Sequence, residues 1–168
     1  MFSEFYKNIL VELPKKIGRA ITSYGYVENN YFKGICYYEI ENNDLLSIIK
    51  PEYRTHFKSS LMVITNKEIL PHTDSDTTMV VNIYIKTANA KTIFYKGGDK
   101  KYQIPNQTNG YVYQKEDLTK VFSFKAIEGD IWKLNVKEIH GVECEKDEVR
   151  MAYCLSTNSL PYNTNVFV

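Results

Sequence analysis

The sequence consists largely of short stretches rich in β-branched and aromatic residues, and segments with helical periodicity are few. Such stretches are typical of half-buried strands. The strongest is Thr77–Ile85, with the sequence TTMVVNIYI. Further strands are predicted at residues 31–40, 60–65, 91–95, 121–126, 130–136 and 148–155, with a small one at 111–113. Because no long helices alternate with these strands, the pattern favours a sandwich or jelly roll over a parallel βαβ sheet.

Only two segments, both in the N-terminal part of the chain, predict helix. Glu4–Leu10 and Asn43–Ile49 are each long enough for about two turns. The second has Asn42 or Asn43 as a candidate N-cap and Pro51 just beyond its end. We therefore expect an all-β dominated jelly roll with a few short N-terminal helices. The 168 residues suit a single domain, 1–168, because no internal repeat or linker divides them.

Composition excludes several classes of protein. Lys and Arg number 21 and Asp and Glu number 20, a net charge of +1. Generic nucleic-acid binding requires an excess of cations to neutralise phosphates, so it is not expected. No run of about 18 apolar residues would span a membrane, and the first residues lack the pattern of a secretory signal. Three cysteines without a CxxC pair suit a reducing compartment, which predicts a cytoplasmic protein. The abundance of Lys, Asn, Ile and Tyr indicates an AT-rich genome, so the cytoplasm is expected to be that of a bacterium or a viral host.

Two of the three histidines lie at the ends of predicted strands. His72 and Asp74 precede Thr77–Ile85, and His140 follows the strand at 130–136. Residues i and i+2 of an extended chain project from the same face, so His72 and Asp74 can reach one ion. With His140 they make two imidazoles and one carboxylate, the set that suits non-haem Fe(II) with open positions. Zinc accepts the same ligands, and a polar turn before a strand is the plain alternative for His72 and Asp74.

Arg150 lies ten residues after His140, inside a stretch (EVRMAYCLST) that otherwise predicts a core strand. A guanidinium buried there requires a partner, and its planar fork matches a carboxylate. The plain alternative is an edge-strand ion pair with Glu143, Glu145 or Glu148. Tyr84 lies on the same strand face as Asn82 and is either functional or a core aromatic with a bonded hydroxyl.

The remaining candidates are predicted to have structural or surface roles. His56 is expected at the surface or a helix end, Asp76 in a solvated turn, and Trp132 in the core. Cys144 and Cys154 are expected to be free thiols in the core.

In combination, these motifs resemble the Fe(II)- and 2-oxoglutarate-dependent dioxygenases, above all small prolyl-hydroxylase-like and phage-type members. The resemblance runs from about Lys58 to Thr157, so we expect the core of the domain that holds the metal site at about residues 58–157. It rests on HTD, NIYI, TIFY, GDIWKLNVKEIHGVE and EVRMAYCLS in that order. Its specificity lies in the combination of HxD, a distal His and an Arg ten residues later. The family resemblance implies a double-stranded β-helix with the metal inside one mouth.

The resemblance also implies a role for each candidate residue. His72, Asp74 and His140 would bind iron, and Arg150 and Tyr84 would bind the distal carboxylate of 2-oxoglutarate. The implied reaction uses O2, hydroxylates a C–H bond of an unidentified substrate and decarboxylates 2-oxoglutarate to succinate. Many members have Ser or Thr two residues after the arginine, where this chain has Ala152. The acid at position 74 speaks against the halogenase branch, which has a small residue there.

Two alternative functions fit the same residues. One is a cupin-like metal-dependent isomerase or dioxygenase that does not use 2-oxoglutarate and needs no buried arginine. The other is a non-catalytic jelly-roll binding module. For the oxygenase, a peptidyl side chain, a nucleobase, a sugar or a small molecule would each serve as substrate, because function depends on the loops.

The irregular stretch Lys96–Lys120 is long and polar for a plain hairpin. It includes Gly97-Gly98 and the tyrosines Tyr102, Tyr111 and Tyr113. Connections of this length in compact domains often have a function. We predict that this stretch, together with Tyr31–Ile40, positions the substrate and that it forms a lid over it, with a plain surface insertion as the alternative.

Overall fold

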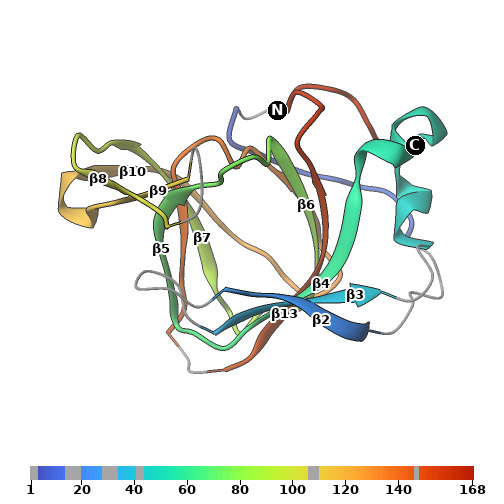
Figure 1. Ribbon diagram of the computed structural model, residues 1–168, viewed down its shortest axis with the longest axis horizontal. Helices are drawn as coiled ribbons and strands as arrows, with labels where there is room; N and C mark the ends of the chain where they lie inside the picture. The colour runs from blue at the N-terminus through green and yellow to red at the C-terminus, as the bar shows by residue number, and fades with distance from the viewer. Residues whose placement is uncertain (1–3, 14–19, 28–33, 41–43, 106–109, 146–147) are drawn as a thin grey trace.

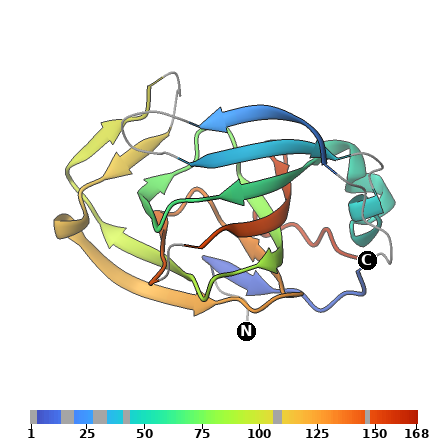
Figure 2. The ribbon, with the colours of Figure 1, turned by 90° about the horizontal axis from the view of Figure 1, so that it is seen from below.

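Two antiparallel sheets face each other in the computed structural model (Figure 1, Figure 2). The structure describes residues 4–13, 20–27, 34–40, 44–105, 110–145 and 148–168. The larger sheet has the strand order β1-β11-β6-β13-β4-β3-β2, and the smaller has the order β10-β7-β12-β5-β9-β8.

The elements of the described chain are as follows. The larger sheet contains β1 (Tyr6–Asn8), β2 (Ala20–Val27), β3 (Ile35–Ile40), β4 (Lys58–Ile64), β6 (Met79–Lys86), β11 (Ile131–Leu134) and β13 (Arg150–Thr157). The smaller sheet contains β5 (Glu68–Thr73), β7 (Lys91–Gly97), β8 (Lys101–Gln103), β9 (Tyr111–Tyr113), β10 (Leu118–Lys125) and β12 (His140–Glu143). The helices are all short 3-10 helices: η1 (Asp44–Ile48), η2 (Pro51–His56) and η3 (Lys115–Asp117).

The strand order is that of a jelly roll. From β4 to β7, and again from β10 to β13, the chain passes from one sheet to the other at every strand. This alternation brings strands that are distant in sequence side by side, as in double-sheet jelly rolls. The predicted fold class agrees with this arrangement, except that within the described chain no strand pairing joins the two sheets into a closed barrel.

Most of the strands predicted from alternation are confirmed, at β4, β6, β7, β9, β10, β11 and β13. Of the strand predicted at residues 31–40, positions 31–33 lie outside the described residues and the remainder contains β3. Strands β1, β2, β5, β8 and β12 were not predicted.

The helix predicted at Glu4–Leu10 is wrong. This segment contains β1, which pairs with β11 at the edge of the larger sheet. A helix of about two turns is marginal by itself, whereas an open sheet edge offers unpaired backbone groups. Phe5 is also buried against Phe94, with ring centroids 5.5 Å apart. The second predicted helix, Asn43–Ile49, is the 3-10 helix η1, and its expected cap at Asn42 or Asn43 lies outside the described residues.

The outer face of the larger sheet is covered by η1, η2 and the C-terminal segment. Leu45 and Ile49 are fully buried in a cluster with Val81 and Leu155 of the sheet. The backbone of Ile49 forms an antiparallel bridge with Phe167, and Figure 1 shows the C-terminus beside the two helices. The opposite, inner face is therefore left to face the smaller sheet. None of the described helices is long and apolar enough to cross a membrane.

Candidate metal centre and its cavity

The two candidate histidines lie opposite each other on adjacent strands. In the antiparallel pairing of β5 with β12, His72 is the register partner of His140. The register then shifts between His140 and Val142. A Cβ at Gly141 would lie 2.8 Å from the carbonyl oxygen of Ile69, so glycine is needed for this close approach. Asp74 follows β5 directly, and its backbone N–H donates to the carbonyl of Val136 at 3.0 Å.

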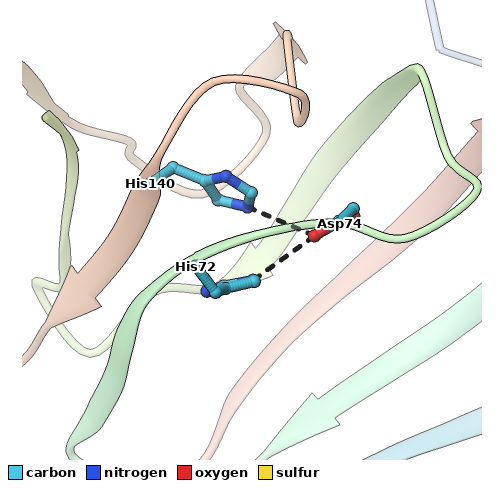
Figure 3. Close-up of side chains that lie close together, drawn as sticks. All are labelled: His72, Asp74 and His140. Atoms are coloured by element: carbon cyan, nitrogen blue, oxygen red, sulfur yellow. Dashed lines mark ion pairs between the residues drawn. The ribbon is translucent and has the colours of Figure 1, made fainter. Parts of the chain in front are cut away.

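The side chains of His72, Asp74 and His140 converge on one point (Figure 3). The Oδ1 atom of Asp74 lies 3.3 Å from Nε2 of His72 and 3.6 Å from Nε2 of His140. One ligand atom from each residue lies within 4.8 Å of the others, so the group can hold a metal ion. The structure thus brings together all three residues that were predicted as ligands.

Backbone carbonyls fix the orientation of both rings. Nδ1 of His72 lies 2.7 Å from the carbonyl oxygen of Leu70, and Nδ1 of His140 lies 2.9 Å from that of Glu138. A carbonyl oxygen only accepts, so each Nδ1 carries a proton, and in the neutral form of each ring the lone pair is then on Nε2, the atom nearest to Asp74. In that form three acceptor atoms face one another, an arrangement that a shared cation stabilises. Metal-binding histidines are usually oriented in this way.

The pKa values of His140 and Asp74 also favour the protonation states in which these side chains bind a metal ion. Burial, followed by the charge of His72, lowers the pKa of His140 to about 4, so this ring is neutral at pH 7. Burial alone would raise the pKa of Asp74. A hydrogen bond from His72 and the positive charges of Lys137 and of the two histidine rings when they are protonated outweigh burial, so the pKa of Asp74 is lowered. A neutral imidazole and an ionised carboxylate are the forms that bind metals.

The three residues lie on the wall of a cavity between the two sheets, with a volume of about 350 Å³. Arg150, Tyr84 and Asn82 line the same cavity, which therefore contains all five residues that were predicted as functional. Small-molecule sites typically enclose about 300–1,000 Å³, so the cavity is at the small end of that range.

Arg150 is buried on the cavity wall and lacks a carboxylate partner within the described chain. Its exposed fraction is 5%. Nη2 donates to the carbonyl of Asn66 at 2.5 Å, while Nε is buried without a hydrogen-bond partner. Burial lowers the pKa of Arg150, and the nearby Cys144 and Tyr84 partly counteract it. Among the described residues, the guanidinium is thus desolvated without a carboxylate to compensate its charge.

The ion pair considered from sequence, between Arg150 and Glu143, Glu145 or Glu148, is not formed among the described residues. Glu143 is bound instead by Lys115 at 2.7 Å and by Lys120 at 3.2 Å. Glu145 and Glu148 are exposed, whereas Arg150 faces the interior. Because these two acids are exposed and Arg150 faces the cavity, their closeness in sequence does not bring them into contact.

Tyr84 is close enough to Arg150 for the guanidinium charge to act on the pKa of its hydroxyl. Burial raises the pKa of Tyr84, although hydrogen bonds with Asn82 and Thr92 oppose the shift. Its hydroxyl therefore stays protonated and can donate. Ala152 is the register partner of Tyr84 on β13 and is 2% exposed. It lines the cavity without offering a hydroxyl there.

Three buried side-chain atoms of the described residues lack a hydrogen-bond partner: Ser75 Oγ, Asn82 Oδ1 and Arg150 Nε. All three residues line the cavity. Buried polar atoms are normally satisfied, so unpaired ones gathered in one cavity indicate that water or a polar ligand binds there. Neither Ser75 nor Asn82 was predicted from the sequence to bind a ligand. For Asn82 a signal was available, because the two-residue period of β6 places it on the same strand face as Tyr84.

The other candidate residues have the following positions. His56 contacts Ser159 at 2.8 Å on the surface, and Trp132 stacks on Phe124 with centroids 3.9 Å apart. Asp76 is exposed, as predicted, and it also lines the cavity. Cys154 is a buried free thiol that lines the cavity. Cys144 is only half-buried, because it lies beyond the end of β12, so its predicted place in the core is wrong.

The predicted lid, Lys96–Lys120, contains β8, β9 and η3, with residues 106–109 outside the described chain. It extends the smaller sheet, because β9 pairs with β5 at Val112 and His72. Ile104, just after β8, is 2% exposed and lines the cavity. The segment therefore lies beside the metal-ligand strand, while its role as a lid stays a prediction.

Comparisons with known proteins leave the family open. No family model matches the chain, and no curated protein matches it. Similar solved structures include a cupin-like protein from Thermotoga maritima, with 11% identity over 83% of this chain and 80% of that one, at a TM-score of 0.44. The non-heme alpha ketoglutarate dependent epimerase SnoN from nogalamycin biosynthesis has 10% identity over 86% and 72%, at 0.48. Vicilin from hazelnut, Corylus avellana, has 12% identity over 89% and 32%, at 0.42. Similarity at this level establishes neither a family nor an activity.

Proposed function

We propose that this protein is an Fe(II)- and 2-oxoglutarate-dependent oxygenase, which uses O2 to hydroxylate a C–H bond of its substrate while 2-oxoglutarate is decarboxylated to succinate. The observation that carries the proposal is a shared cavity. Three converging acceptors and a buried guanidinium without a carboxylate partner among the described residues line it together. The acceptors match a metal ion, and the guanidinium matches an anionic ligand.

His72, Asp74 and His140 would hold the ion. Two imidazoles and one carboxylate occupy one face of an octahedron and leave three positions for other ligands. Bound Fe(II) supplies the redox chemistry that couples O2 and a 2-oxo acid to C–H oxidation. The carbonyls of Leu70 and Glu138 keep both rings in the ligating orientation.

Arg150 and Tyr84 would bind the distal carboxylate of 2-oxoglutarate. A carboxylate beside the unpaired Nε of Arg150 supplies the negative charge that the described residues lack. The neutral hydroxyl of Tyr84 would donate to the same carboxylate. Ala152 contributes no hydroxyl, so the guanidinium carries most of the co-substrate affinity. A metal enzyme that does not use an oxo acid would have no need of this buried cation.

The test is calorimetric titration of 2-oxoglutarate into Mn(II)-loaded protein. We expect Arg150→Ala to keep Mn(II) affinity and to weaken 2-oxoglutarate by about 2 to 4 kcal/mol, because one half of a buried charge pair is removed. Arg54→Ala is the matched control, since Arg54 donates to the carbonyl of Ile49 and does not line the cavity. Equal 2-oxoglutarate affinity in wild type and Arg150→Ala would end the co-substrate assignment.

A further inference from the structure

The cavity lining contains a polar set and an apolar set of residues. The polar set includes Asn82 and Tyr84 of β6, Thr92 of β7 and Arg150 of β13, the groups that match an oxo acid. The two sets meet where Arg150 is the register partner of Ile64. The apolar set, which we name the apolar wall, consists of Ile35, Tyr37, Met62, Ile64, Ile69 and Ile104. Apart from the metal ligands, the charged residues in the described lining are Asp76, Lys86 and Arg150, and none belongs to the apolar wall.

The apolar wall is assembled from both sheets. Ile35 and Tyr37 of β3 are register partners of Ile64 and Met62 of β4. Ile104 comes from the other sheet, and its backbone N–H donates to the carbonyl of Gly110 at 2.9 Å. Strand β3 and the β8–β9 pair lie outside the eight strands that alternate between the sheets. These additions thus present apolar side chains to the cavity that holds the candidate metal centre.

Apart from the hydroxyl of Tyr37, the side chains of the apolar wall offer no hydrogen-bond partner to a dicarboxylate. Carboxylates and keto oxygens placed against isoleucine and methionine would lose hydration without gaining partners. The unpaired atoms of Asn82 and Arg150 lie outside this wall. The apolar wall is therefore suited to the ligand that shares the cavity with the co-substrate.

We propose that the apolar wall binds the primary substrate, and that the part bound there is an uncharged hydrocarbon group about as large as one amino-acid side chain. The inference rests on the proposed function. A volume of about 350 Å³, which is at the small end of ligand sites and would be shared with 2-oxoglutarate, favours a small group at the wall. Tyr37 is the one wall residue with a polar side-chain atom, so the hydroxyls of a sugar or a charged group would lose more hydration there than they regain in hydrogen bonds.

The hydrocarbon group can belong to a free small molecule or to a peptide residue. Two probes separate these sources: 3-methyl-1-butanol, and N-acetyl-leucine methylamide, which adds peptide groups to the same side chain. Uridine and N-acetyl-aspartate methylamide are the polar counterparts. Each probe is titrated into protein loaded with Mn(II) and 2-oxoglutarate, and succinate release is then measured with Fe(II) and O2.

We expect at least one leucine-like probe to bind and to raise succinate release, and both polar probes to do neither. Ile104→Ala should weaken the apolar probe about 10-fold, because contact area at the apolar wall is lost. Val112→Ala is the matched control. Val112 packs in the same cluster but does not line the cavity, so it should change binding less than 2-fold. Ile104→Val, with a smaller loss, serves if Ile104→Ala does not fold.

The outcomes separate the two proposals. Preferred binding of uridine or the aspartate derivative, no binding of any apolar probe, or equal losses in the Ile104 and Val112 variants would overturn the apolar-wall proposal. The proposed function would stand if Mn(II) and 2-oxoglutarate still bind. Failure of 2-oxoglutarate to bind the metal-loaded protein would overturn the proposed function, whatever the leucine-like probes show.

Discussion

Two buried cations lie on opposite faces of the larger sheet, and their surroundings differ. Lys133 of β11 is 1% exposed and faces the C-terminal segment. Its Nζ donates to the carbonyl of Thr164 at 2.8 Å and lies 4.9 Å from the ring centroid of Tyr162. Arg150 of β13 is 5% exposed and faces the cavity, and its Nε has no partner in the described chain.

The difference separates a structural cation from one that is suited to a ligand. Burying a cation costs free energy unless polar partners and π-faces compensate. The protein itself supplies such partners to Lys133. For Arg150 the described residues supply one backbone carbonyl and leave Nε without a hydrogen-bond partner, so its described surroundings are suited to an added anion. Changes on the inner face should therefore alter binding, and changes on the outer face should alter stability.

The largest effect is expected at the metal centre on the inner side. His72→Ala, Asp74→Ala and His140→Ala should each lower Mn(II) affinity by more than about 100-fold, since losing even an outer-sphere partner commonly costs about 10- to 100-fold. Competition with a metal-sensitive chelating dye measures the affinity. His56→Ala and Lys133→Ala should change it little. Undiminished Mn(II) binding in the His140 variant would show that the third ligand is assigned wrongly.

The next effect concerns stability. Lys133→Ala should lower the free energy of unfolding by about 2–4 kcal/mol, because it leaves a cavity and an unpaired carbonyl at Thr164. Arg150→Met should leave the free energy of unfolding unchanged or raise it by about 1 kcal/mol, because an incompletely paired buried charge is replaced by an apolar side chain. Urea denaturation measures both variants. A larger loss of stability in Arg150→Met than in Lys133→Ala would reverse the two roles.

The smallest expected effect is the pH dependence of the free energy of unfolding that comes from Lys133, on the outer face of the larger sheet. Burial, and then the charge of Lys7, lowers the pKa of Lys133 from 10.5 to about 8. Between these values the unfolded chain holds a proton that the folded chain has released, so stability rises with pH. This gain in the free energy of unfolding is complete above pH 10.5 and is lost as the pH falls through 8.

Lys133→Met removes this titration and is the matched control. Relative to this variant, the wild type should gain about 1 kcal/mol between pH 8 and pH 9, measured by urea denaturation at each pH. Parallel pH profiles for the two proteins would contradict the assignment.

The sequence predicts the long strands well and the ligand strands poorly. Strand β6 is eight residues long and consists mostly of β-branched and aromatic residues, so a short window of sequence is enough to predict it. Strand β5 contains Pro71 next to a register shift, and β12 has four residues that include Gly141. Both strands depend on pairing with neighbours that are distant in sequence, and a local pattern does not record such pairing.

The site was predicted from residue types whose roles are restricted. His72, Asp74, His140 and Arg150 were found because metal ligands and buried arginines are rare and their order is informative. Ser75 and the individual residues of the apolar wall were not predicted, although residues 31–40 and 96–120, which contain three of them, were predicted to position the substrate, because serine and isoleucine are common in any β domain. These residues line a common cavity only because the two sheets face each other. Only the three-dimensional arrangement places Ile35 and Ile104, far apart in sequence, on one cavity.

The most direct test of the account is the metal dependence of 2-oxoglutarate binding in the wild-type protein. Calorimetric titrations are compared for metal-free protein, Mn(II)-loaded protein and Mn(II)-loaded Arg150→Ala. The account predicts tight binding in the loaded wild type only, because both the ion and the guanidinium must hold the co-substrate. Equal binding with and without Mn(II), or no binding by the loaded wild type, would contradict it.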